Sequence, residues 1–506
     1  MPPHEPADPT IAWRDWSATT FAQARADRRP VLLALGTAWS EACAHLDDTG
    51  YRDPALVTIV ADRFVPVRVD ADDRPDIDAR YGLGGYPATL CLTPDGEVLD
   101  GAVLLDGSAI ASMLRRAADA VADRGEAIAA GTRAAVARRA RARAAVQSAP
   151  ADDLSPIQWL ERRLLEAFDP RYGGFGDGPK MPHLGALGFA LRRHRETGDP
   201  ALGRVVTTSL DAMASQGLHD PIDGGLYRCA ESADWSEPHS EKLLEYNAEA
   251  LQLYLDAWQV FGRSSYREVA DAVRRYVVET LWSAARRGFR NSQRADGGYH
   301  ALGTAAARAA APAPPVDPRV YVPSSARMIS ALFQLGLVTG SDDAAARAQE
   351  ALDQLLLRAY EPGGGVGHTV EAHPPVRGLL IDQVRVGAAA LDAHDATGDD
   401  VYGDLAQEIM LFVLRVMRDD RTGGLLDRAP AASDDAVGLL REPMTSAELT
   451  GEAARVLLRL ARATARDEFG HRACEALDAC RSSYRASDLL AAPYVQAVAD
   501  AAAGTR

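Results

Sequence analysis

The chain has 506 residues, which is too long for one ordinary hydrophobic core and predicts at least two domains. Its residues are 47% hydrophobic and 25% charged, a composition typical of soluble globular proteins. The net charge of −16 argues against a nucleic-acid-binding surface, and the longest apolar runs are too short to span a membrane, so neither kind of partner is expected.

The N-terminal residues and the cysteines both favour the cytoplasm. Residues 1–10 are acidic and rich in proline, and they lack the charged start and apolar stretch of a signal peptide. The number of cysteines is odd and they are scattered, which fits a reducing compartment. These cysteines are Cys43, Cys91, Cys229, Cys474 and Cys480. No spacing of Cys and His is typical of a zinc site, so we expect no metal and no cofactor.

The first elements predict a small α/β domain. They are a helix over 17–31 that leads into a buried strand at Val31–Leu35, a helix from about Ser40, an alternating strand at 65–70, a helical turn at 76–81, a hairpin of 89–92 and 98–99, and a helix from about Ser108. The turn Pro94-Asp95-Gly96 joins the hairpin. This order of elements is thioredoxin-like, and we place the domain at residues 1–125.

The sequence around Ser40 argues against dithiol chemistry. Trp39-Ser40-Glu41-Ala42-Cys43 follows the first core strand, where thioredoxins carry W-C-x-x-C, and Pro87 lies where they carry a cis-proline. Disulfide exchange needs a nucleophilic thiolate at the helix start and a second, resolving thiol. Ser40 holds the first position, so we expect no dithiol oxidoreductase. We favour the interpretation that Cys43 is an inert, buried thiol. Redox chemistry of Cys43 alone is the alternative.

Residues 126–154 are predicted to form a helical linker. The segment is rich in alanine and arginine, and its arginines include Arg133, Arg138, Arg139, Arg141 and Arg143. A basic run can mark an anionic partner. The acidic charge of the whole chain favours instead a solvated helix, with a domain boundary at residues 148–155.

Two kinds of turn alternate from Ser155 onward, which indicates an internal repeat. One kind has two glycines before an apolar residue, at 173–175, 224–226, 297–299, 364–366 and 423–425. The other is a tight helix–helix turn, at 197–199, 261–263, 339–341, 397–399 and, without glycine, 464–466. Helical patterns fill every interval, and they add up to twelve helices.

Twelve antiparallel helices in six hairpins predict an (α/α)6 toroid over residues 155–506. Because the helices alternate in direction, all double-glycine loops should lie on one rim, where the inner helices begin. Helix N-termini carry partial positive charge. We therefore expect the ligand pocket on this rim.

The segment Trp235–Leu244 provides the first candidates for a site. It is predicted to open a helix, with Ser236 as N-cap and Pro238 in the first turn, so that His239, Glu241 and Lys242 crowd one end. Glycoside hydrolysis needs two carboxylates, and Glu241 could converge with Asp382 from another inner helix. Epimerisation needs a base, for which His239 and His183 are candidates. The structural alternative, favoured for these residues, has His239 capping the helix and Glu241 in an ion pair.

These features together resemble a known family. The motifs are Val69–Asp78, Gly178–His183 and Pro238–Leu244, and they are similar to those of thioredoxin-domain proteins related to spermatogenesis-associated protein 20. That family joins a thioredoxin-like domain to a toroid similar to N-acylglucosamine 2-epimerases and six-hairpin glycosidases. Ser40 and the stretches 324–326, 381–382 and 444–447 depart from the family pattern, which implies a divergent branch with a degenerate site.

The resemblance implies a carbohydrate-like small molecule as the ligand of the toroid. If the chain is an enzyme, it would be glycosidase-like or sugar-epimerase-like, with His239, Glu241 and Asp382 as catalytic candidates. Lys180, His183, Lys242 and Arg319 are the candidates for binding the ligand. The alternative is a non-catalytic scaffold that keeps both folds and binds a protein partner.

Overall fold

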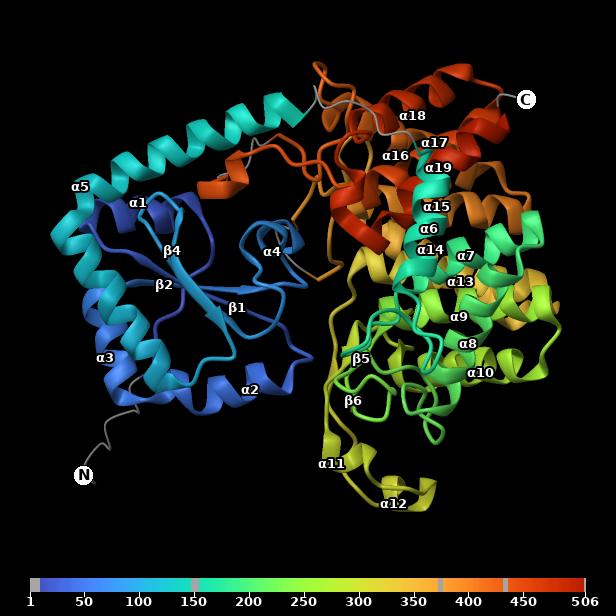
Figure 1. The fold of residues 1–506 in the computed structure, drawn as a ribbon, viewed down its shortest axis with the longest axis horizontal. Coiled ribbons are helices and arrows are strands. Elements are labelled where there is room, and N and C mark those ends of the chain that lie inside the picture. Colours follow the sequence, from blue (N-terminus) through green and yellow to red (C-terminus); the bar gives the residue numbers. More distant parts are fainter. Residues whose placement is uncertain (1–9, 147–153, 372–375, 431–435, 505–506) are drawn as a thin grey trace. The chain divides into compact units, whose positions relative to one another are not determined.

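The computed structural model describes residues 10–146, 154–371, 376–430 and 436–504 (Figure 1). The chain forms two compact units. One comprises Met1–Gln147 with Pro430–Pro443, and the other comprises Ser148–Ala429 with Met444–Arg506. Within the described ranges, no helix combines the length and the apolar character needed to cross a membrane.

The first unit is built on a four-stranded sheet in the order β2-β1-β3-β4. Strand β1 (Val31–Gly36) pairs in parallel with β2 (Val65–Asp70) and antiparallel with β3 (Ala88–Leu92), which forms a hairpin with β4 (Val98–Val103). Both faces of β1 are buried, which explains its unbroken apolar run. The predicted α/β domain with thioredoxin-like element order is confirmed.

Helices cover both faces of this sheet. They are α1 (Ala18–Asp27), α2 (Glu41–Asp48), α3 (Pro54–Arg63), α4 (Pro75–Tyr81) and α5 (Gly107–Val146), with a 3-10 turn at Gly50–Arg52. Leu33 and Leu35 of β1 pack in one core with Tyr81, whereas Leu32 and Ala34 pack in the other with apolar residues of α3 and α5. The alternation along β1 thus gives each face its own core.

A late segment of the chain completes the first unit. The 3-10 helix Gly438–Arg441 places Leu440 in the same core as Tyr81. The Tyr81 hydroxyl accepts the Leu439 N–H at 2.9 Å and donates to the Gly96 carbonyl at 2.6 Å. The prediction of a continuous toroid over 155–506 therefore needs correction, because residues 437–441 pack in the first unit. This short segment has no periodicity that could have revealed its role.

The predicted linker is largely part of α5. This helix continues to Val146 through a kink at Arg124, so residues 126–146 extend the first unit. Arg139 donates to Glu97 and Glu442 at 2.7 Å each, which ties the helix to its own unit. Residues 148–153 of the predicted boundary, and the side chain of Arg143, lie outside the described residues.

The second unit contains the twelve predicted long helices in its described residues. They are α6 (Pro156–Ala167), α7 (Leu184–Thr197), α8 (Pro200–Ser215), α9 (Leu244–Phe261), α10 (Ser264–Tyr276), α13 (Val322–Thr339), α14 (Asp342–Ala359), α15 (Leu380–Thr397), α16 (Asp400–Val416), α17 (Ala447–Thr464), α18 (Asp467–Ala479) and α19 (Ala492–Gly504). Helices α7, α9, α13, α15, α17 and α19 contact one another in this order, and α19 returns to α7. They form the closed inner ring of an (α/α)6 toroid, which confirms the predicted fold.

The two rims differ as the repeat predicted. Each inner helix except α19 is followed by a tight turn, with a left-handed residue such as Gly198 or Gly262 at the helix end. Long loops precede the inner helices. They carry β5 (Cys229–Ala230), β6 (Pro238–His239), β7 (Lys242–Leu243), β8 (Trp282–Ser283), β9 (Gly288–Phe289), β10 (Ser292–Gln293), β11 (Val316–Asp317), β12 (Tyr360–Glu361), β13 (Gly365–Val366), α11 (Gly297–His300), α12 (Ala305–Ala309), and the short helices Val277–Leu281 and Tyr484–Ala491. Figure 1 shows α11 and α12 beyond the ends of the neighbouring helices of this unit.

Candidate functional site

Three long loops of the toroid share one turn, in which an aspartate lies four positions before the first of two glycines. The aspartates are Asp169, Asp220 and Asp419. In each turn the aspartate N–H donates to the carbonyl of the second glycine, and the first glycine N–H donates to the aspartate carbonyl. The aspartate side chain also accepts the N–H two residues later, as in an Asx turn. The repeated sequence therefore specifies a repeated loop.

Two motif lysines stabilise these loops from inside. The Lys180 ammonium donates to Asp169 Oδ2 at 2.8 Å and also to the Gly176 carbonyl. The Lys242 ammonium donates to Asp220 Oδ2 and to the carbonyl of Gly224, both at 2.7 Å. Both lysine side chains are fully buried. The structure thus places these two ligand-binding candidates inside loop walls, each with an aspartate partner.

Around Lys242, two carboxylates and a histidine are spaced like the ligands of a metal ion, but Lys242 and Arg308 already neutralise the carboxylates. Ligand atoms of Asp220, Asp223 and His300 lie within 4.8 Å of one another. However, Arg308 of α12 donates to Asp220 at 2.6 Å and to Asp223 at 2.7 Å. Burial lowers the pKa of Lys242 to about 8 against the pull of Asp220. Burial opposes ionisation of Asp220, but His300, Lys242 and Arg308 hold its pKa well below the usual range. We assign the cluster as an ion-pair network.

His239 and Glu241 do not open a helix as predicted. Pro238 and His239 form β6, which pairs with β5, and α9 begins only at Leu244. Pairing with β5 outweighs the local preference of proline for a first helical turn. His239 Nε2 lies 2.5 Å from a carboxylate oxygen of Glu231. Glu241 is buried and accepts from Arg228 Nε at 2.5 Å.

Of the remaining candidates, Asp382 and Arg319 each have a side-chain partner. Asp382 lies in the first turn of α15, fully buried, 2.8 Å from His368 Nδ1. The Arg319 guanidinium donates to both carboxylate oxygens of Asp317. His183 precedes α7 with a left-handed φ of 43°, and burial lowers its pKa. Glu241 and Asp382 each have a polar partner of their own, and their convergence across a substrate stays a prediction.

A chain of ion pairs crosses the centre of the inner ring, and sequence reasoning missed it. The guanidinium of Arg385 on α15 donates to Glu245 of α9 at 2.8 Å and to Glu452 of α17 at 3.3 Å. Arg327 of α13 donates to Glu452 at 2.5 Å and to Glu249 of α9. Four inner helices thus contribute to one cluster. Glu245 and Glu249 are four residues apart near the start of α9, which puts them on one helix face. This spacing could have indicated the cluster only if the order of helices around the ring were already known.

This cluster separates the protonation states of its carboxyl groups. Burial opposes ionisation of Glu452, but Arg327 and Arg385 outweigh it and lower its pKa to about 2. The pKa of Glu245 is lowered in the same way, chiefly by Arg385 against its burial. Glu448 lies one turn before Glu452 on α17, and burial together with the Glu452 charge raises its pKa to about 7. A carboxyl group that keeps its proton up to about pH 7 therefore lies near carboxylates with lowered pKa values at the start of the inner helices.

Glu448→Gln is expected to stabilise the protein above neutral pH. Below pH 4.5 the carboxyl is protonated in both states. Between pH 4.5 and about 7 the folded protein keeps a proton that the unfolded chain releases, so this stabilisation is lost as pH rises. The substitution should raise the unfolding free energy by about 1–3 kcal/mol at pH 8 and leave it unchanged at pH 4.

Urea titrations at both pH values measure this difference. Glu166→Gln on α6 is the matched control, because that carboxylate is exposed and paired with Arg162 on the helix surface. An equal effect of Glu448→Gln at pH 4 and pH 8 would contradict the raised pKa.

A polar cavity of about 490 Å³ lies inside the ring. Its wall includes Arg327, Arg385 and Glu452, and from there it extends along the inner helices to Arg459 and Arg462 near the end of α17. The wall residues thus run toward the tight-turn rim. The prediction of a pocket on the double-glycine rim is not tested by this cavity and stays a prediction.

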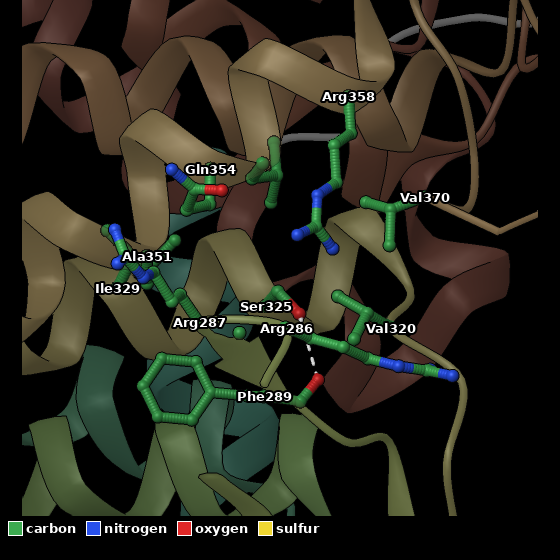
Figure 2. A pocket seen from close by; sticks show the side chains of 12 residues that line it. Arg286, Arg287, Phe289, Val320, Ser325, Ile329, Ala351, Gln354, Arg358 and Val370 are labelled. Atoms are coloured by element: carbon green, nitrogen blue, oxygen red, sulfur yellow. Dashed lines mark hydrogen bonds between the residues drawn. The ribbon is translucent and has the colours of Figure 1, made fainter. Parts of the chain in front are cut away.

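A second recess lies between α13, α14 and the hairpin β8–β9 (Figure 2). Its volume is only about 10 Å³, close to what one water molecule needs. Ser325 donates to the Phe289 carbonyl at 3.4 Å on its floor, and the guanidinium of Arg358 points toward it. It is too small for a sugar ring, so we do not assign it a ligand.

The first unit shows the degenerate redox motif directly. Ser40 is the N-cap of α2, and its Oγ accepts the Cys43 N–H at 3.2 Å. The Cys43 thiol is buried, and burial raises its pKa. The Tyr86–Pro87 peptide bond is cis, as the sequence predicted. The geometry of a thioredoxin-like motif is therefore present without its nucleophilic thiolate.

We expect the protein not to reduce insulin disulfides above the background rate. A serine hydroxyl cannot act as a thiolate, and the buried Cys43 thiol is mostly protonated at neutral pH. Turbidity of insulin with dithiothreitol as reductant measures the rate. The control is Ser40→Cys, which restores two thiols in the motif. Catalysis by the wild-type protein at a rate similar to a dithiol thioredoxin would contradict the expectation.

Comparisons with known proteins agree with both halves of this description. Residues 4–135 match the family described as Thioredox_DsbH, protein of unknown function, DUF255. The chain is 27% identical to mouse (Mus musculus) spermatogenesis-associated protein 20 over 307 residues, which cover 56% of this chain and 39% of the mouse protein. The resemblance inferred from the motifs is confirmed, and the match spans about two fifths of that relative's length.

Solved structures share the fold of the toroid. A sugar epimerase from a ruminal bacterium superposes with a TM-score of 0.52 at 14% identity, over 65% of this chain and 87% of the epimerase. A GH76 α-mannanase from Bacteroides thetaiotaomicron gives a TM-score of 0.52 at 10% identity, over 69% of this chain and 96% of the mannanase. At these identities the likeness shows the (α/α)6 fold alone.

Proposed function

We propose that the toroid binds and processes a carbohydrate-like molecule at the start of its inner helices. The feature that carries the proposal is a pair of carboxyl groups in first helical turns with pKa values shifted in opposite directions, since the pKa of Glu448 is raised to about 7 and that of Glu245 is lowered by Arg385. Proton transfer to and from a sugar needs such an acid and base together. The fold shared with a sugar epimerase and a mannanase supports a saccharide as the substrate class.

The roles follow from the surroundings of each group. Glu448 holds a proton because burial and the Glu452 charge disfavour its ionisation, so it is the proton donor. Glu245 has a half-exposed side chain held by Arg385 at 2.8 Å, so its second oxygen can accept a substrate proton or hydroxyl. Both residues lie in first helical turns, where the helix dipoles favour bound oxygen atoms.

Turnover of disaccharides tests the proposal. The wild-type protein is incubated with cellobiose and with α-1,6-mannobiose, and the products are separated by chromatography to detect hydrolysis or epimerisation. Glu448→Gln should still bind the substrate but lower the rate by about 10²–10⁴, the usual contribution of a general acid. Glu241→Gln is the control, because Glu241 pairs with Arg228 in a loop.

Two results would overturn the proposal. One is an unchanged rate in Glu448→Gln and Glu245→Gln. The other is the absence of both turnover and thermal shift with every saccharide tested, which would favour the scaffold alternative with a protein partner.

We also propose the cytoplasm as the compartment. All five cysteines are free thiols, and four of them are buried. Persistent free thiols are typical of a reducing environment. Fractionation of cells that express the tagged protein would test this.

A further inference from the structure

We propose that the cavity on the tight-turn side of the central ion pairs is a second ligand site, which takes an uncharged, hydroxyl-rich molecule of monosaccharide or disaccharide size. Its volume of about 490 Å³ lies within the usual range of small-molecule pockets. All six inner helices contribute to its wall. The exposed Arg462 and the half-exposed Arg455 line it, so it opens to solvent.

This cavity is distinct from the acid–base pair described above. The ion-paired Arg327, Arg385 and Glu452 are among its lining residues, whereas Glu245 and Glu448 are not. Those two glutamates lie in the first turns of α9 and α17, whereas the residues of these two helices that line the cavity lie in later turns. The ion-paired Arg327, Arg385 and Glu452 thus border this cavity, whereas the proposed acid and base do not.

Two glycines of α7 keep the cavity wide. A Cβ added at Gly185 or at Gly188 would meet nothing within 4 Å, and both residues line the cavity. Glycine inside a helix costs stability, which is normally recovered where another backbone approaches closely. No such approach exists at these two positions. The open space itself, rather than packing, is what these glycines provide.

The charges on the wall define the class of ligand. Arg455 pairs with Asp500 at 3.0 Å, and Arg459 pairs with Asp392 at 2.8 Å. Arginine and acidic residues are equally numerous in the lining, so the wall does not select a charged ligand. Paired guanidinium and carboxylate groups offer donors and acceptors side by side, which suits hydroxyls because each hydroxyl both donates and accepts.

A buried donor at this wall lacks an acceptor. The side chain of Arg385 is 6% exposed, and its Nη1 has no hydrogen-bond partner within the described part of the chain. An unpaired buried donor is unfavourable, and a ligand hydroxyl that reached it would remove that cost. Gln252 and Ser330 add neutral polar groups along the same wall.

Substitution of Gly188 tests the proposal without touching any polar group. Gly188→Phe should fill the cavity and weaken cellobiose binding by at least about tenfold, whereas Gly188→Ala adds one methyl group and should leave it unchanged. Equilibrium dialysis with labelled cellobiose counts bound molecules per chain, with glucose and glucose 6-phosphate as further probes. Circular dichroism and thermal melting confirm that each variant is folded.

The outcomes separate this site from the proposed acid–base function. A loss of one bound cellobiose in Gly188→Phe, with turnover retained, supports a second site. Equal binding by Gly188→Phe and Gly188→Ala would overturn it while leaving the proposed function intact. Tighter binding of glucose 6-phosphate than of glucose would overturn the assignment to uncharged ligands. If Gly188→Phe binds cellobiose normally while Glu448→Gln loses turnover, only the acid–base function survives.

Discussion

Lys242→Met is expected to lower the free energy of unfolding by about 3–5 kcal/mol, the usual cost of removing one partner from a buried ion pair. Lys242 and Asp220 have no exposed side-chain area, and their charged atoms are 2.7 Å apart. Methionine fills a similar volume but cannot donate, so Asp220 and the Gly224 carbonyl each lose a hydrogen bond. Arg308 still contacts Asp220, which favours the lower end of that range.

Urea unfolding followed by far-ultraviolet circular dichroism measures the loss. Lys180→Met is the matched comparison, since it breaks the equivalent pair with Asp169, whose side chain is 13% exposed and can be partly hydrated. It should therefore cost less. The double variant Asp220→Asn/Lys242→Met should lose less than the sum of its single variants, because neither then leaves an unpaired charge.

The opposite result would change the interpretation of the motif. If Lys242→Met unfolds like the wild type but loses thermal stabilisation by saccharides, then Lys242 is a ligand contact as the sequence resemblance suggested. A contact of that kind would require the loop to open, since the ammonium is enclosed by Asp220, Gly224 and the ring of Tyr276.

The architecture could be predicted from the sequence because it repeats. Alternating tight turns and double-glycine loops fix the direction of every helix, and a closed ring is then the natural way to bury the inner faces. One loop segment is an exception. Position in the chain alone places Leu440 in the toroid, but Leu440 packs with Tyr81 in the first unit. One apolar residue in a loop carries no periodic signal, so only the tertiary contact reveals it.

The candidate site could be predicted only in part, for a different reason. His239 and Glu241 drew attention because charged residues cluster in a recognisable motif. A motif rich in charged residues can also serve to hold a loop together by ion pairs, as the pair of Glu241 with Arg228 shows. Glu245, Glu448 and Arg385 have no local motif, because their partners come from helices far apart in the chain. Their roles depend on the closed ring.

The second large effect is expected for Gly451→Ala, which should lower the free energy of unfolding by about 3 kcal/mol or more, at the upper end of overpacking costs. Gly451 lies inside α17, against the backbone of α19. A Cβ there would lie 2.3 Å from the Tyr494 nitrogen and 2.4 Å from the Pro493 carbonyl carbon. These are backbone atoms, so the clash cannot be relieved by rotating a side chain, and the two inner helices must move apart.

Gly188→Ala provides the contrast within the same ring. Both glycines lie inside inner helices, but a Cβ at Gly188 would meet no atom within 4 Å. Alanine should therefore raise the unfolding free energy there by about 0.8–1 kcal/mol through helix propensity alone. Thermal melts of the two variants against the wild type should shift in opposite directions. If both substitutions raise the melting temperature, the backbones of α17 and α19 are farther apart at Gly451 than in this structure. If both destabilise, Gly188 serves packing rather than the cavity, and the second ligand site loses its main support.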